Sequence, residues 1–161
     1  MKKLILFIFI LSTSSLFSQN IDNYIEMLRS DLKTKKTEII SDNISLTEAE
    51  SEKFWPVYRE YSLKLDKISD KRVKYIKEYA DNFDTMTEKK ADKIVDQAFN
   101  YYEDRISLEK KLYKKTKKIL GVIKAAKLVQ LEHQINVLID VEIGSQLPLI
   151  EKTADKTTDK K

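Results

Sequence analysis

The clearest pattern along the chain is a repeat of apolar side chains in steps of three and four residues, which is the spacing of a helix face. It is first seen in residues 21–40, where one polar residue, Lys35, interrupts it. The polar run that follows (41–45) competes for backbone hydrogen bonds and ends the pattern. We therefore predict a first helix over 21–40, with its apolar face at Ile21, Ile25, Leu28, Leu32 and Ile39.

A second helix begins with a recognisable start signal. Thr47 and Glu50 have the spacing of a capping box, in which each side chain accepts a hydrogen bond from the other residue's backbone N–H. Pro56 lies inside this helix, where its ring should clash with the carbonyl of Glu52 and kink the axis. The helix is predicted to run to about Phe83 with a heptad seam at Phe54, Tyr58, Tyr61, Leu65, Ile68, Arg72, Tyr75 and Tyr79.

Two further helices are expected. A second capping box, Thr85 with Glu88, predicts the start of the third helix, and Gly121 predicts its end. The fourth helix ends near Gly144, and the apolar segment 147–150 should then dock on the body. The third helix carries two adjacent stripes, Ile94/Ala98/Tyr101/Leu108/Leu112/Ile119 and Val95/Phe99/Tyr102/Ile106/Tyr113; the fourth carries Leu128, Leu131, Ile135, Leu138 and Ile139.

Composition supports an all-α fold. The 161 residues include only two Gly and two Pro, which strands and tight turns need and helices exclude. With no Cys, disulfides and thiolate metal sites are excluded. Four long helices with narrow seams predict a thin, elongated molecule that buries less than a compact domain of this size. The apolar stripe left over favours a homodimer.

The N-terminal residues have the pattern of a secretory signal peptide. Lys2 and Lys3 precede eight apolar residues (4–11) and a polar exit. Eight residues are too short to span a bilayer, which argues against the alternative of a retained anchor. We predict cleavage after Ser18 and a periplasmic location. The mature chain would then have a helical domain at 19–150 and a disordered polar tail at 151–161.

The sequence offers little for catalysis. His133 is the only histidine, so we interpret it as a surface or groove-edge residue. Acids alternate with lysines at helical spacing, as on a solvated face. The formal net charge is +4, of which the leader's two lysines supply half, so nucleic acid is not an expected partner. We expect no enzyme, no cofactor and no metal site.

The segment Ile-Ser-Leu-Thr-Glu-Ala-Glu-Ser-Glu-Lys-Phe-Trp-Pro-Val-Tyr (44–58) resembles the first signature of the Spy/CpxP-like periplasmic proteins, whose motif is Leu-Thr-x-x-Gln. Glu50 replaces the motif's Gln, and 120–127 occupies the place of the second motif without its Thr. The Phe-Trp-Pro-Val-Tyr portion resembles the branch labelled sensor of an ECF-type sigma factor. The resembling positions are Leu46, Thr47, Glu50, Phe54, Trp55, Pro56 and Tyr58.

The resemblance implies an elongated, bent helical hairpin that pairs as an antiparallel, cradle-like dimer. This dimer would hold unfolded or partly folded envelope proteins without ATP. The alternative is a periplasmic regulator that binds one membrane-bound signalling partner of a sigma-factor or two-component system. A third reading is a structural envelope protein with neither activity.

Three features are candidates for binding, and each has a structural alternative. Lys114, Lys115, Lys117 and Lys118 form a basic patch that attracts acidic client segments or anionic lipid heads, or else a solvated helix end. The eight tyrosines pack in the core or line a groove. Trp55, beside the seam, closes the motif turn against the first helix or contacts a client.

Overall fold

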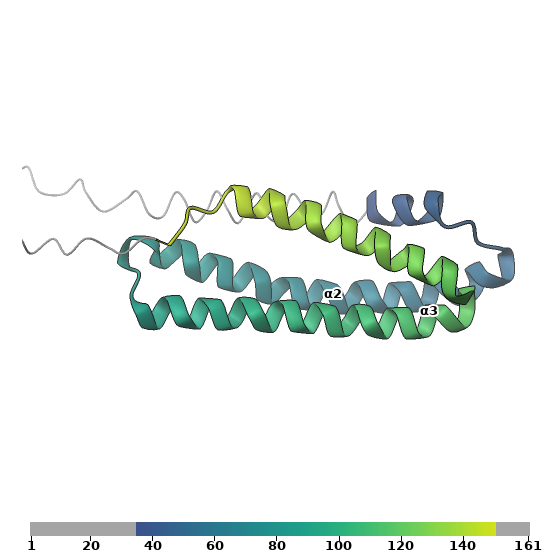
Figure 1. Cartoon of the computed structure of the whole chain (residues 1–161), viewed down its shortest axis with the longest axis horizontal. Helices are drawn as coiled ribbons and strands as arrows, with labels where there is room; N and C mark the ends of the chain where they lie inside the picture. The colour runs from purple at the N-terminus through teal and green to yellow at the C-terminus, as the bar shows by residue number, and fades with distance from the viewer. Residues whose placement is uncertain (1–34, 151–161) are drawn as a thin grey trace, which may run out of the picture.

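The computed structural model describes residues 35–150, and they contain helices and no strand. Residues 35–43 are helical. They lead into α2 (Glu48–Asn82), a short 3-10 helix η1 (Phe83–Thr85) and α3 (Glu88–Ser145). Figure 1 shows a long, thin arrangement in which α2 and α3 run side by side. The all-α prediction is confirmed for this part of the chain.

The predicted capping box opens α2. The Glu50 N–H donates to Thr47 Oγ1 at 3.3 Å, and the Thr47 N–H donates to Glu50 Oε2 at 2.8 Å. The helix continues through Pro56 without a break. Pro56 is exposed, so the carbonyl of Glu52 that loses its donor is open to water instead of being left unpaired in the core.

The predicted start of the third helix at Thr85 is wrong. Thr85 belongs to η1, and the N-cap of α3 is Thr87, whose hydroxyl accepts from the Lys90 N–H at 3.3 Å. The reason lies in Met86, which is extended and buried in the core. Burying this side chain delays the helix by two residues, although Thr85 and Glu88 have capping-box spacing.

Gly121 divides α3 into two arms, 88–120 and 122–145, and Figure 1 shows the second arm folding back along the first. Its φ of 76° and ψ of 172° are non-helical. A side chain rarely adopts such a positive φ, whereas glycine does so readily. The stop predicted at Gly121 is therefore seen as a break within α3, and the second arm contains the residues predicted as a fourth helix.

The core consists of two apolar clusters. The Tyr75 cluster lies near η1 and contains Tyr75, Ile76, Tyr79, Ala80, Met86, Ile94, Tyr101 and Ile143. The Phe54 cluster lies toward Gly121 and contains Ile40, Ile44, Phe54, Tyr58, Tyr61, Leu108, Leu112, Leu120 and Leu128. The predicted seam of α2 supplies much of both clusters.

Several predicted core positions are exposed. In the helical residues 35–43 Ile40 is fully buried while Ile39, the predicted core position, is 37% exposed. Leu138 on the second arm is also exposed. The 147–150 segment is non-helical as expected. Leu147 packs on the Tyr75 cluster and the Pro148 carbonyl accepts from the Tyr79 hydroxyl, whereas Leu149 and Ile150 face solvent.

The predicted signal peptide at 1–18, the apolar positions Ile21 to Leu32 and the polar tail at 151–161 lie outside the described residues.

Candidate binding surfaces

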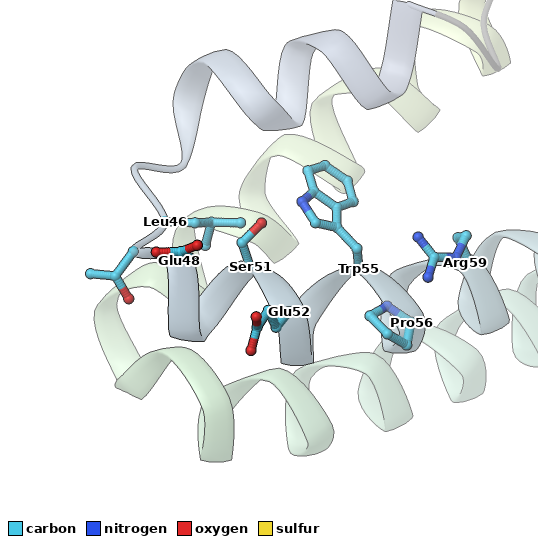
Figure 2. Close-up of a pocket in the computed structure, with 8 residues that line it drawn as sticks. Leu46, Glu48, Ser51, Glu52, Trp55, Pro56 and Arg59 are labelled. Carbon is cyan, nitrogen blue, oxygen red and sulfur yellow. The ribbon is translucent and has the colours of Figure 1, made fainter.

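The motif residues of α2 contribute to the Phe54 cluster. Phe54 and Tyr58 are buried, and their rings stack with centroids 5.6 Å apart. Trp55 is half-buried and makes edge contacts with both rings. It packs against the cluster that holds Ile40, and Figure 2 shows its indole pointing toward the helical residues 35–43. These positions tie the start of α2 to the preceding helix.

A shallow, open depression surrounds Trp55 on the outer side of α2 (Figure 2). Its lining is mostly polar or charged: Leu46, Thr47, Glu48, Ser51, Glu52, Trp55, Pro56 and Arg59. Glu50 does not line it, because its carboxylate accepts from Lys124 Nζ at 2.6 Å. The depression is too open to enclose a small molecule.

One carboxylate is buried in the core and is bonded to residues of other segments. Glu132, on the second arm, is fully buried and accepts from the hydroxyls of Tyr58 at 2.8 Å and Tyr61 at 2.7 Å. Lys36 Nζ reaches the same carboxylate at 2.6 Å. Burial, reinforced by the charge of Glu132, raises the pKa of both tyrosines above their usual range. Each partner of Glu132 lies on another helix of the bundle, so we interpret this network as structural.

Glu109 lies next to this network. Its Oε1 accepts from Asn136 Nδ2 at 2.9 Å, which joins the two arms of α3. Burial raises the pKa of this carboxyl; Arg105 opposes the shift, and the charge of Glu132 adds to it.

A second polar group joins α2 to both arms. Asp140 accepts from Arg72 Nη1 at 2.6 Å and from Arg105 Nη1 at 3.0 Å. The two guanidinium groups lie 5.3 and 5.4 Å from the centre of the Tyr101 ring. Arg72 is therefore a buried seam residue that is neutralised within the bundle.

The second predicted stripe of α3 is the exposed one. Its members Val95, Phe99, Tyr102 and Ile106 are between 37% and 62% exposed. Arg105 and Glu109 contact Asp140 and Asn136, so they lie on the face of the first arm that is turned toward the second arm. By helical periodicity the stripe lies on the neighbouring face of the first arm. Two more exposed apolar residues, Val137 and Val141, border it from the second arm.

The four lysines of the predicted basic patch are all exposed. Lys115 Nζ pairs with Glu60 of α2 at 2.7 Å, and Lys117 Nζ lies 5.5 Å from the centre of the Tyr113 ring. Lys114 and Lys118 form no ion pair within residues 35–150. The patch thus contains lysines that remain available to an anionic partner.

Sequence reasoning missed the buried network. The signal was present, because Glu132 falls on the face formed by Leu128 and Ile135, at steps of four and three. An acid at an otherwise apolar seam position predicts a buried ion pair, but the partners of Glu132 come from two distant segments, α2 and the helical residues 35–43.

His133 is exposed, and residues 35–150 contain no group of three side chains suited to holding a metal ion. No helix among the described residues is long and apolar enough to cross a membrane. No family model, curated protein or solved structure matches the chain.

Proposed function

We propose that this chain is a Spy/CpxP-like periplasmic protein that binds unfolded or partly folded envelope proteins without ATP, as a chaperone-like holdase and not as an enzyme. The observation that carries the proposal is the exposed apolar stripe of Val95, Phe99, Tyr102 and Ile106, four side chains aligned along one helix. The motif at 44–58 adds the resemblance to the family.

The stripe suits loose binding of apolar segments. It is an open surface bordered by Val137 and Val141, so it imposes little shape on a bound chain. Affinity would come from apolar area removed from water, at roughly 25 cal/mol per Å². Permissive surfaces of this type bind many partners weakly. Lysines on the same arm would speed the approach of acidic clients.

We further propose that the whole chain forms four long helices in a bent cradle and that two copies associate. An elongated bundle buries less apolar surface than a compact domain of equal length. The exposed apolar side chains on both arms of α3 support association with a second copy.

The regulator remains the second candidate, supported by the Phe-Trp-Pro-Val-Tyr segment at 54–58. It would use the same fold to bind one membrane-bound signalling partner in place of many clients. Binding of several unrelated unfolded proteins at similar strength would exclude it.

Aggregation suppression tests the main proposal. The mature protein should delay light scattering by two unrelated denatured clients. A Phe99→Ser/Ile106→Ser variant should lose most of this effect while keeping its helical spectrum. The matched control, Leu63→Ser/Leu149→Ser, removes two apolar residues from elsewhere that are at least as exposed and should behave like the parent. Equal loss in both variants, or no suppression by the parent, would contradict the proposal.

A further inference from the structure

Two exposed aliphatic residues lie at the turn between the arms of α3. Ile123 is 82% exposed and Val122 57% exposed. They follow Gly121, beside which an added Cβ would meet no atom within 4 Å. Figure 1 shows this turn at the end of the molecule opposite η1. We call Gly121, Val122 and Ile123 the elbow: a strongly exposed apolar pair at this end of the molecule, beside the segment that leads into α2.

The sequence around the elbow is strongly basic. Between Glu109 and Glu132 there is no acid, and the residues in that interval include eight lysines: Lys110, Lys111, Lys114, Lys115, Lys117, Lys118, Lys124 and Lys127. Three of these have partners in the bundle: Lys115 with Glu60, Lys124 with Glu50, and Lys127 with the carbonyl of Asn43.

The remaining lysines face outward from the bundle. Lys110, Lys114 and Lys117 follow one another at steps of four and three, so they share one face of the first arm. All three are exposed, as are their neighbours Lys111 and Lys118. None of these five forms an ion pair within residues 35–150. A line of exposed lysines without an ion-pair partner among the described residues therefore leads along the first arm to the elbow.

The acids at this end lie elsewhere. Glu48 and Glu52 line the depression around Trp55 on α2. The side of α2 that meets the first arm is marked instead by Glu60, which pairs with Lys115. Helical periodicity places Glu48 and Glu52 on a different side of α2 from Glu60, and within residues 35–150 neither acid forms an ion pair with these lysines.

We propose that the elbow docks on an anionic lipid bilayer, with Val122 and Ile123 inserted among the acyl chains and the free lysines on the headgroups. This combination favours a membrane over a protein segment because two adjacent, strongly exposed side chains offer a bound chain little apolar area, whereas a deformable acyl layer can surround them. Lysines bury their methylene stems and keep their ammonium groups at the phosphates. The elbow and the stripe consist of different residues, so insertion of the elbow can be tested separately from client capture by the stripe.

Vesicle sedimentation tests the docking. The mature protein, from residue 19, would be mixed with vesicles of pure phosphatidylcholine or with vesicles containing 30% phosphatidylglycerol. Binding should occur on the anionic vesicles only and should weaken as salt rises. A Lys114→Gln/Lys117→Gln/Lys118→Gln variant should partition at least about tenfold less. The control Lys67→Gln/Lys74→Gln/Lys89→Gln has the same net charge and should bind like the parent.

A second measurement locates the inserted residues. The chain has no cysteine, so Ile123→Cys and Leu63→Cys variants can each be labelled at one position with an environment-sensitive fluorophore. Anionic vesicles should raise the emission at position 123 and leave position 63 unchanged. The proposal is overturned if the protein does not bind the anionic vesicles, if both lysine variants bind them equally, or if the emission at position 123 does not rise. The last outcome, with binding intact, would indicate purely electrostatic adsorption or another docking face.

Discussion

At the scale of single residues, Glu132 decides how the bundle is held. A buried carboxylate is costly unless it is paired and hydrogen-bonded, and Glu132 is satisfied by two tyrosines of α2 and by Lys36. The preceding helix is thus attached to the body by a buried ion pair as well as by Ile40 and Ile44.

Lys36→Met should lower the free energy of unfolding by about 3 kcal/mol, because it leaves Glu132 buried without its cation. Chemical denaturation followed by circular dichroism measures this. The matched control is Lys35→Met, since Lys35 is exposed and should tolerate the change. Equal effects of the two substitutions would show that the pair contributes nothing specific.

Glu109 should make stability depend on pH in the opposite sense to an ordinary ion pair. Burial raises the pKa of Glu109 in the folded state. When the pH rises above the pKa of the unfolded state, about 4.3, ionisation of Glu109 therefore destabilises the native protein. Glu109→Gln keeps the acceptor for Asn136 and removes the charge. It should be more stable than the parent at pH 7, and this advantage should shrink below pH 4. Denaturation midpoints at several pH values would check this, and an advantage confined to low pH would contradict it.

At the scale of elements, the apolar period and the capping chemistry predict α2 well. Phe54, Tyr58 and Tyr61 follow the seam, and Thr47 caps the helix as expected. The start of α3 is mispredicted because burial of Met86 overrides the spacing of Thr85 and Glu88. Local patterns reveal which residues can cap a helix, but tertiary packing selects the one that does.

Periodicity also could not predict how wide a face of α3 is buried. Two adjacent rows were predicted to contact neighbours, but only the row containing Tyr101 and Leu108 is buried. The pattern shows that Phe99 and Ile106 are apolar and aligned, but not that they face solvent. The candidate surface therefore needed the structure, although its residues were visible in the sequence.

The two glycines of α3 offer a matched prediction. Gly121→Ala should cost about 1–2 kcal/mol, because alanine is strained at a φ of 76°. Gly144→Ala should instead stabilise by roughly 0.5–1 kcal/mol, because Gly144 lies near the end of α3 without a positive φ and an added Cβ meets no atom there. Thermal unfolding of both variants measures the contrast. Shifts of the same sign would contradict the elbow geometry.

At the scale of the whole molecule, the thin bundle leaves apolar side chains exposed along both arms of α3. This architecture suits a protein whose function is to offer surface, because all the described buried polar groups around Glu132 and Asp140 serve internal contacts. Clients, a second copy and a membrane would each cover part of that exposed surface.

The mature protein should sediment as a dimer at micromolar concentration. A charge introduced on the stripe, such as Phe99→Asp, tests whether the stripe forms the dimer interface. The variant becomes monomeric if the stripe is the interface and stays dimeric if the dimer uses another face. A stable monomer for the unmodified protein would contradict the proposed cradle.

The most direct test of client capture is site-specific photocrosslinking. A benzoylphenylalanine residue would replace Phe99 on the stripe or, in the control, Leu63 on α2, two positions that are equally exposed at 62%. The proteins would be irradiated with a denatured client and analysed by mass spectrometry. The account predicts client adducts at position 99, at least severalfold above those at position 63, and none when the client is native. Equal adducts at the two positions, or none at position 99, would contradict it.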